Sequence, residues 1–302
     1  MVQEAVNLGF EYMELSHGIR LSLVPGILQA VDEGLIKISS VHNFCPLPPG
    51  VFGAAPNLYQ PTANTQAEQA LWFRHTLRTI DFAARVGAGL VVVHCGSIRY
   101  LWRDAAKDLE EKADLLPVED RRTSSDYQGQ LSRCLRRMKR KQKGAYNRLV
   151  ENLQRIVPFA REKGVRLGLE NREDFNELPM DTEMPRLLAD VGDPEVVGYW
   201  HDCGHAQIKE QLQITTQRQL LEENHARQFG FHLHDVDADE HDHQPIGTGV
   251  IDWQFIRSCI RPEHLLVLEL SPKLRSRQVL DSKEFMLKLL AEDAQAPAAA
   301  GK

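Results

Sequence analysis

Residues 197–205, with the sequence VGYWHDCGH, contain the pattern from which the fold can be predicted. The apolar run at 196–200 predicts a short buried strand, because it is rich in β-branched and aromatic residues. Asp202 and His205 come at the C-terminal end of this strand, where the chain is expected to turn. A carboxylate and an imidazole at this spacing can bind a divalent metal ion. An isolated Asp-x-x-His pair is equally often a hydrogen-bonded turn, so this interpretation depends on the rest of the chain.

The same arrangement of apolar segment, polar residue and helical pattern recurs along the chain. Strands are predicted at residues 12–15, 36–41, 90–93, 165–169, 196–200, 228–231 and 265–268. Helices are predicted at residues 2–8, 21–33, 66–86, 145–160, 184–189, 217–226, 252–260 and 282–291. Alternating strands and helices imply a parallel sheet with right-handed crossovers. Seven compact units predict an α/β fold of the (β/α)8 TIM-barrel type. The pattern begins on a helix, so the first strand of a full barrel is not evident, and a doubly wound open sheet is the alternative.

The predicted domain organisation is one barrel domain, residues 1–292, followed by a disordered tail at 293–302. A helical insertion is expected at 98–145, after the strand that ends at His94, and its charges are first acidic and then basic. A basic run of this kind is usually a solvated helix face, and phosphate or partner binding is the alternative. Because the insertion follows a strand end directly, we expect it beyond the C-terminal face of the barrel, over a pocket or against a partner subunit.

Composition and charge narrow the class of protein. The 302 residues carry a net charge of −6, which disfavours a nucleic-acid partner. No apolar run reaches the ~20 residues needed to cross a bilayer, and the N-terminus does not have the pattern of a signal peptide. The five cysteines are scattered, which favours reduced thiols in a cytoplasmic protein over a disulfide framework. We therefore expect a cytoplasmic protein that binds a small molecule, with homo-oligomerisation left open.

Carboxylates and imidazoles follow nearly every predicted strand. They are His42, His94, Glu170, Asp202 with His205, His232 with His234, and Glu269. A barrel directs its strand ends into one cavity, so these residues should converge although they are far apart in the sequence. A strand-end histidine is often only structural, whereas an acidic residue after four apolar ones is costly unless it is paired or bound to metal. The mixture of imidazole and carboxylate suits one Mn²⁺, Zn²⁺, Co²⁺ or Fe²⁺ ion better than Mg²⁺.

Several short segments together resemble the xylose isomerase-like TIM-barrel superfamily of sugar phosphate isomerases and epimerases, ketose 3-epimerases and endonuclease IV. The matching segments are LGLEN (167–171), HDCGH (201–205), FHLHD (231–235), IGTG (246–249) and LVLEL (266–270). The resemblance covers roughly residues 2–95 and 146–290 and excludes the insertion. It implies that one divalent metal ion is bound by four residues, which are Glu170, Asp202, His232 and Glu269.

The resemblance to the sugar enzymes implies a metal-dependent isomerase or epimerase in carbohydrate metabolism. Glu170 and Glu269 would be catalytic, removing and returning the substrate proton through an enediolate. Five further residues would bind the sugar or sugar phosphate, and these are His42, His94, Asn171, His205 and His243. We expect this function.

Two other functions remain alternatives. In a zinc phosphodiesterase of the endonuclease IV type, acting on DNA, several of the same histidines would bind additional zinc ions. A site for three zinc ions would also require an acidic residue two positions before His243, where this chain has His241. A non-catalytic barrel is the third possibility. Metal content separates the two enzyme classes, since one ion per chain supports the isomerase and three zinc ions the phosphodiesterase.

Overall fold

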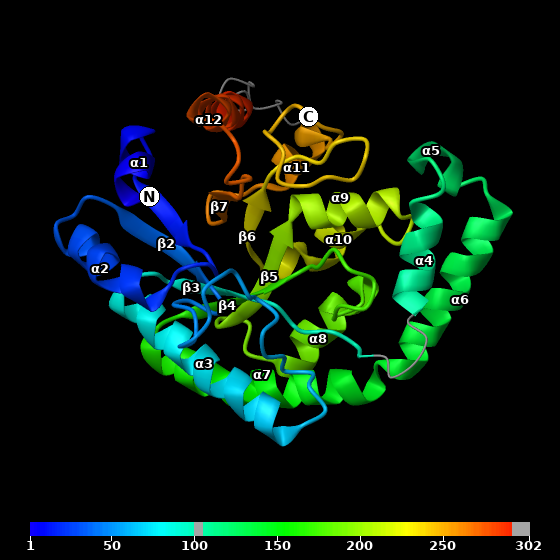
Figure 1. Ribbon diagram of the computed structural model, residues 1–302, viewed down its shortest axis with the longest axis horizontal. Helices are drawn as coiled ribbons and strands as arrows, with labels where there is room; N and C mark the ends of the chain where they lie inside the picture. Colours follow the sequence, from blue (N-terminus) through cyan, green and yellow to red (C-terminus); the bar gives the residue numbers. More distant parts are fainter. Residues whose placement is uncertain (100–104, 292–302) are drawn as a thin grey trace, which may run out of the picture.

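The computed structural model describes residues 1–99 and 105–291. Residues 100–104 of the predicted insertion and the predicted disordered tail at 293–302 lie outside the described residues. Seven parallel strands form one sheet in the order β1-β2-β3-β4-β5-β6-β7, curled into a nearly closed barrel (Figure 1). The strands are β1 Tyr12–Leu15, β2 Lys37–His42, β3 Leu90–Val93, β4 Arg166–Glu170, β5 Val197–Asp202, β6 Gln228–Leu233 and β7 Leu265–Leu268.

The helices lie outside the sheet. They are α1 Val2–Asn7, α2 Val24–Asp32, α3 Gln66–Arg85, α4 Ala105–Ala113, α5 Val118–Arg121, α6 Ser125–Lys141, α7 Lys143–Lys163, α8 Met184–Val191, α9 Cys203–Gln211, α10 Gln217–Asn224, α11 Trp253–Cys259 and α12 Ser276–Ala291. Short 3₁₀ turns are η1 Leu21–Leu23, η2 Asp181–Glu183 and η3 His225–Arg227. Among the described residues, no helix combines the length and the apolar character needed to cross a membrane.

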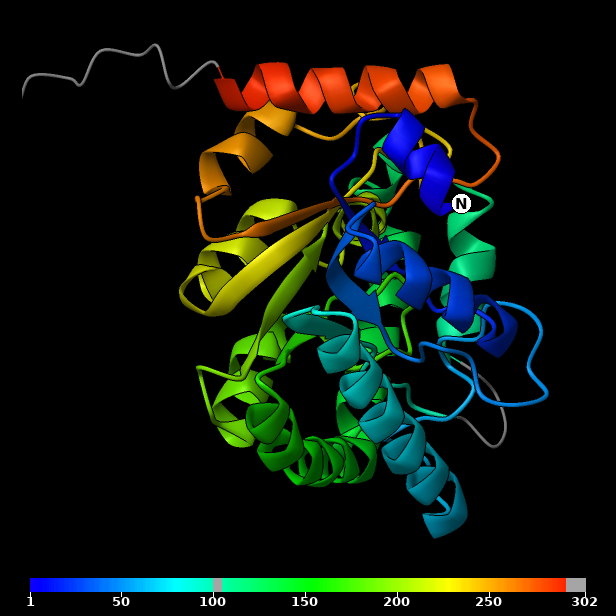
Figure 2. The ribbon, with the colours of Figure 1, turned by 90° about the vertical axis from the view of Figure 1, so that its left-hand side faces the viewer.

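The strand order confirms the predicted barrel type. A doubly wound sheet reverses its strand order at one point, whereas here every strand pairs with the next one in the sequence. The sheet keeps two edges, β1 and β7, which agrees with a (β/α)8 barrel that lacks one strand. Helix α12 lies across this side of the barrel near α1 (Figure 2), where the Lys283 ammonium donates to the carbonyl oxygen of Leu8 at 3.1 Å.

Successive side chains of a strand point alternately into the barrel interior and towards the surrounding helices. All four residues of β3 are buried. Leu90 and Val92 cluster with Trp200 of β5, whereas the intervening valines belong to the larger core that includes the helices. A Cβ at Gly230 of β6 would lie 2.5 Å from the Trp200 ring, so glycine is needed there to make room for the indole. Trp200 in turn contacts the ring of His232 at a centroid distance of 5.1 Å, so the packed interior forms the floor of the site described below.

Helix α9 was not predicted, because the sequence CGHAQIKEQ has no continuous apolar stripe. It forms directly after β5 because Asp202 caps it: the Asp202 carboxylate accepts a hydrogen bond from the backbone N–H of His205 at 2.7 Å. The expected turn after Asp202 is therefore the start of a helix. This cap also fixes where the Asp202 and His205 side chains lie.

The described part of the insertion consists of α4, α5, α6 and the start of α7, at the edge of the molecule away from α1 and α12 (Figure 1). Arg121 is buried and pairs with Glu240, at 2.5 and 2.7 Å, in the segment after β6. The Tyr127 hydroxyl donates to the carbonyl oxygen of Leu212, just after α9, at 3.1 Å. The insertion is thus attached to segments that follow the C-terminal ends of β5 and β6.

Candidate functional site

Four side chains from consecutive strand ends meet at the C-terminal face of the barrel. Glu170 ends β4, Asp202 ends β5, His232 lies near the end of β6, and Glu269 directly follows β7. One potential ligand atom from each residue lies within 4.8 Å of those of the other three. The side chains of the first three are at most 1 % exposed, whereas that of Glu269 is 26 % exposed. The four-residue cluster is therefore sealed from below and open beside Glu269.

The His232 ring is oriented from behind by Glu14, a residue of β1 that the sequence did not single out. The Nε2 atom of His232 lies 3.0 Å from Glu14 Oε1, and the Ser40 hydroxyl donates to Glu14 Oε2 at 2.6 Å. When Nε2–H donates to Glu14, the lone pair of Nδ1 faces the carboxylates of Glu170 and Glu269, both at 2.8 Å. Metal-binding histidines are oriented by a carboxylate in this way.

The charges in the four-residue cluster fit a divalent cation. Three buried or half-buried carboxylates surround one imidazole. Burial opposes charge on His232, but Glu269 and Glu14 outweigh it and hold the pKa of His232 well above its usual value. Burial would also raise the pKa of Glu269, and the neighbouring His232 instead holds it far below its usual range. Three oxygen donors and one nitrogen donor suit Mn²⁺, Zn²⁺, Co²⁺ or Fe²⁺.

Asp202 is held in place by contacts with Asn171 and His234. The Asn171 side chain donates to the Asp202 carbonyl oxygen at 2.9 Å and accepts from the Asp202 backbone N–H at 2.8 Å. The Nε2 atom of His234 lies 3.1 Å from Asp202 Oδ1. A Cβ at Gly204 would lie 1.9 Å from the His234 ring, so only glycine allows α9 to approach it. These contacts leave Asn171 occupied by the backbone of β5.

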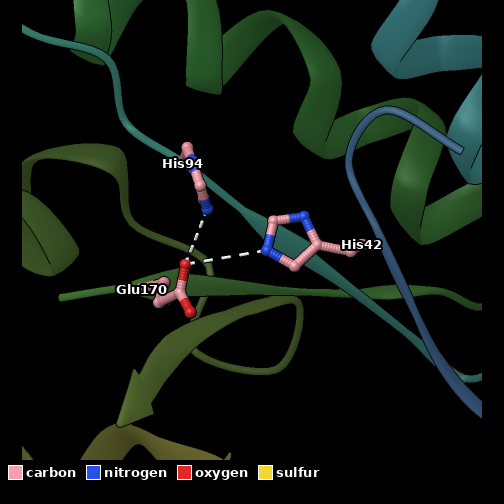
Figure 3. Close-up of side chains that lie close together, drawn as sticks. All are labelled: His42, His94 and Glu170. Atoms are coloured by element: carbon pink, nitrogen blue, oxygen red, sulfur yellow. Dashed lines mark ion pairs between the residues drawn. The ribbon is translucent and has the colours of Figure 1, made fainter. Parts of the chain in front are cut away.

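Two predicted substrate-binding histidines lie on the other side of Glu170. Figure 3 shows the imidazoles of His42 and His94 pointing at the same carboxylate oxygen, Glu170 Oε2, at 3.7 and 2.9 Å. Their ring centroids are 4.7 Å apart, and His17 lies 4.7 Å from His42. Burial and, to a smaller extent, the nearby Arg172 lower the pKa of His94 to about 4. Burial and the neighbouring His42 and His94 lower the pKa of His17 to about 3. The neutral imidazoles of His94 and His17 can bind hydroxyl groups or metal, whereas at His42 burial is outweighed by Glu170, which raises the pKa of His42.

Arg172 and Glu177 form a buried ion pair beside the cluster that sequence reasoning missed. The Arg172 guanidinium donates to Glu170 Oε2 at 2.8 Å and to Glu177 Oε1 at 3.2 Å. Its side chain is 9 % exposed and that of Glu177 is 3 % exposed. The only sequence signal is the position of Arg172 two residues after Glu170. Arg172 thus supplies a positive charge next to a predicted metal ligand.

The two remaining predicted substrate-binding residues belong to other groups of potential ligands. His205 lies with Glu173 and Asp242, and His243 lies with His234 and Glu269. In each group, one ligand atom per residue lies within 4.8 Å of the others. His241 instead has a 70 % exposed side chain that pairs with Asp237 at 3.0 Å.

The sequence matches a known barrel family, and the fold is similar to those of solved sugar epimerases. The family model described as xylose isomerase-like TIM barrel matches residues 2–286. A solved structure of an L-ribulose 3-epimerase is 13% identical, with a TM-score of 0.67 over 99% of this chain and 92% of that chain. A D-tagatose 3-epimerase-like protein is 19% identical, with a TM-score of 0.59 over 94% of this chain and 91% of that chain. The 3-keto-D-glucoside 4-epimerase of E. coli is 15% identical, with a TM-score of 0.64 over 95% and 92%. At these identities the likeness shows the fold, and no curated protein sequence matches significantly.

Proposed function

The chain belongs to the xylose isomerase-like TIM-barrel family, and on this premise we propose that it is a divalent-metal-dependent isomerase or epimerase of a sugar or sugar phosphate. The observation that carries the proposal is the convergence of Glu170, Asp202, His232 and Glu269 within 4.8 Å at the C-terminal face. Structural neighbours with this fold include sugar epimerases, which supports the same class of substrate.

The proposed reaction begins with removal of a proton from the carbon next to a carbonyl group. Such a carbon acid is far too weak for an unassisted carboxylate. A bound divalent ion would supply the positive charge that stabilises the developing enediolate. The chain supplies the bases: Glu170 and Glu269 come from β4 and β7, on different sides of the cluster, so one can remove the proton and the other return it.

Neighbouring residues would hold the sugar. His42, His94, His205 and His243 offer imidazole nitrogens close to the four-residue cluster and are proposed to bind hydroxyl groups. Asn171 is hydrogen-bonded to the Asp202 backbone, so we propose that it acts mainly by positioning Asp202. We also propose that residues 1–292 form one domain with an insertion at 98–145, and that the protein is cytoplasmic.

An endonuclease IV-like zinc phosphodiesterase is the second candidate, favoured by three further groups of potential ligands. They are His42, His94 and Glu170; His234, His243 and Glu269; and Glu173, His205 and Asp242. The first two groups share a carboxylate with the four-residue cluster and His205 lies 3.5 Å from Asp202, so these groups offer places for additional zinc ions.

Elemental analysis combined with two activity assays tests the proposed function. We expect one divalent ion per chain and exchange of a carbon-bound substrate hydrogen with deuterated water for at least one sugar or sugar phosphate in a ketose and aldose panel. Three zinc ions together with cleavage of abasic DNA would replace the proposal by the phosphodiesterase. An Asp202→Asn variant should lose metal, whereas a His225→Gln variant serves as a control because this exposed histidine belongs to none of the ligand groups.

Replacing Glu14 with Gln is expected to weaken metal binding by about tenfold, the lower end of the range for residues that orient a ligand. Gln keeps an oxygen that can accept from His232 Nε2–H but removes the negative charge that raises the basicity of the ring. Competition with a chromophoric chelator measures the dissociation constant. Glu11→Gln is the matched control, since Glu11 is exposed just before β1. Equal affinities of the two variants would show that Glu14 does not orient a metal ligand.

A further inference from the structure

A cavity of about 230 Å³ lies between the insertion and the barrel, apart from the four-residue cluster. Its apolar wall comes from α6 and from the segments that follow β4 and α9, and consists of Leu135, Met138, Phe175, Met180 and Ile214. None of its lining residues belongs to the groups of potential metal ligands. The cavity is therefore separate from the proposed metal site.

The charged residues of this cavity are mainly cationic. Arg136, Lys139 and Lys209 line it together with a single acidic residue, Asp181. The Lys209 side chain is 4 % exposed, and its ammonium donates to Asp181 Oδ2 at 3.2 Å. An ammonium group has three N–H donors, and this is its one side-chain hydrogen bond among the described residues. Unsatisfied donors in a buried place are costly, so Lys209 can accommodate a further acceptor.

Arg136 and Lys139 lie at the rim of the cavity, on the exposed side of α6. Within residues 1–99 and 105–291, neither side chain takes part in a hydrogen bond or an ion pair. Two cations without partners over a buried lysine create a positive potential at the mouth of an apolar cavity. This combination selects for a ligand that carries a negative charge at one end and an apolar body at the other.

We propose that this cavity binds a small amphipathic carboxylate. The carboxylate lies near Lys209, Arg136 and Lys139, and the apolar body packs against Met138 and Phe175. Sites for drug-sized ligands span ~300–1,000 Å³, so a cavity of about 230 Å³ fits a smaller molecule, with a body of the size of one six-membered ring.

The methionines provide a direct probe of this site. Met138 and Met180 line the cavity, whereas Met13 and Met286 lie elsewhere in the structure. With ¹³C-methyl-labelled methionine in the full chain, benzoate or hexanoate should shift the methyl signals of Met138 and Met180 in a saturable manner. The signals of Met13 and Met286 should stay in place, and benzyl alcohol should bind at least about tenfold more weakly than benzoate, because it lacks the charge. Met138→Leu and Met180→Leu assign the signals.

A pair of double charge reversals tests the role of the rim. Arg136→Glu with Lys139→Glu should raise the dissociation constant of benzoate by about tenfold, which corresponds to ~1.4 kcal/mol. Arg133→Glu with Arg140→Glu changes the net charge equally on the same helix, but these residues do not line the cavity. This control should change the constant by less than about threefold, since screening weakens distant charges. All four residues are exposed, and circular dichroism checks that both variants fold.

Three results would overturn the proposal. The first is the absence of a saturable shift at Met138 and Met180 with both carboxylates. The second is equal binding of benzyl alcohol and benzoate. The third is an equal loss of affinity in the two double variants, which would mean that the overall charge of α6 attracts the anion and that the cavity does not.

Discussion

Replacing Glu269 with Gln is expected to lower the exchange of the substrate's carbon-bound hydrogen by ~10²–10⁴-fold, the usual loss when one general base is removed. Gln keeps the size of the side chain and one oxygen that can bind metal, but it cannot take up the proton. Glu269 is the carboxylate of the four-residue cluster with 26 % exposure, so a substrate can reach it without a rearrangement. Exchange in deuterated water, with a substrate that the native protein turns over, measures the effect.

The same substitution at Glu170 should cause a loss in the same range. The Glu170 Oε2 atom is contacted by Arg172 and His94, so Glu170→Gln also disturbs that ion pair and should destabilise the fold, whereas Glu269→Gln should not. Metal should remain partly bound in both variants, because Asp202 and His232 are unchanged. Glu263→Gln is the control: it is the same chemical change at an exposed residue just before β7. Native exchange rates in both variants would mean that the bases lie elsewhere, with His205 the first residue to test.

Replacing Arg172 with Met is expected to lower the free energy of unfolding by ~3–5 kcal/mol, the typical cost of removing one partner of a buried ion pair. Met keeps much of the volume but leaves the carboxylates of Glu170 and Glu177 buried without their cation. Urea unfolding at neutral pH measures the loss. The exposed Arg186, whose side chain is 61% exposed and which pairs with Asp190 at 3.4 Å, is the control: Arg186→Met should cost at most ~1 kcal/mol.

Two further measurements separate a charge effect from a packing effect at Arg172. The double variant Arg172→Met with Glu177→Gln should recover part of the lost stability, because one buried charge is then removed as well. In the native protein, burial raises the pKa of Glu177 but the Arg172 guanidinium outweighs it and holds that pKa below its usual value. The stabilisation from this pair is therefore present at neutral pH and is lost as the pH falls through the lowered pKa of Glu177. The difference between the native protein and Arg172→Met should shrink in acid, and a pH-independent difference would contradict the role of charge.

Local patterns were sufficient to predict the barrel and a set of carboxylates and imidazoles at its strand ends, whereas the resemblance to the xylose isomerase-like superfamily implied which four of them would bind one metal ion. Each of the seven strands is a short apolar run that is recognisable by itself, and parallel strands bring their C-terminal ends to the same face. Glu170, Asp202, His232 and Glu269 were expected to converge with the other strand-end residues for this reason, since each lies at or just beyond the end of such a run. Helix α9 was missed because its sequence has no apolar stripe, and it depends on the cap that Asp202 provides.

The partners of these residues could be identified only from the tertiary structure. Glu14 and His232 are separated by 218 positions, and Glu14 lies in a strand whose pattern gives no sign of a polar contact. Arg172 and Glu177 look like ordinary charged loop residues until the fold buries them. The cavity beneath α6 forms where the insertion meets segments that follow β4 and α9. The sequence by itself therefore determined which groups face the centre of the barrel, because that depends on strand periodicity. The tertiary structure decided which buried charges are paired and how the imidazoles at the site are oriented, because these depend on contacts between distant segments.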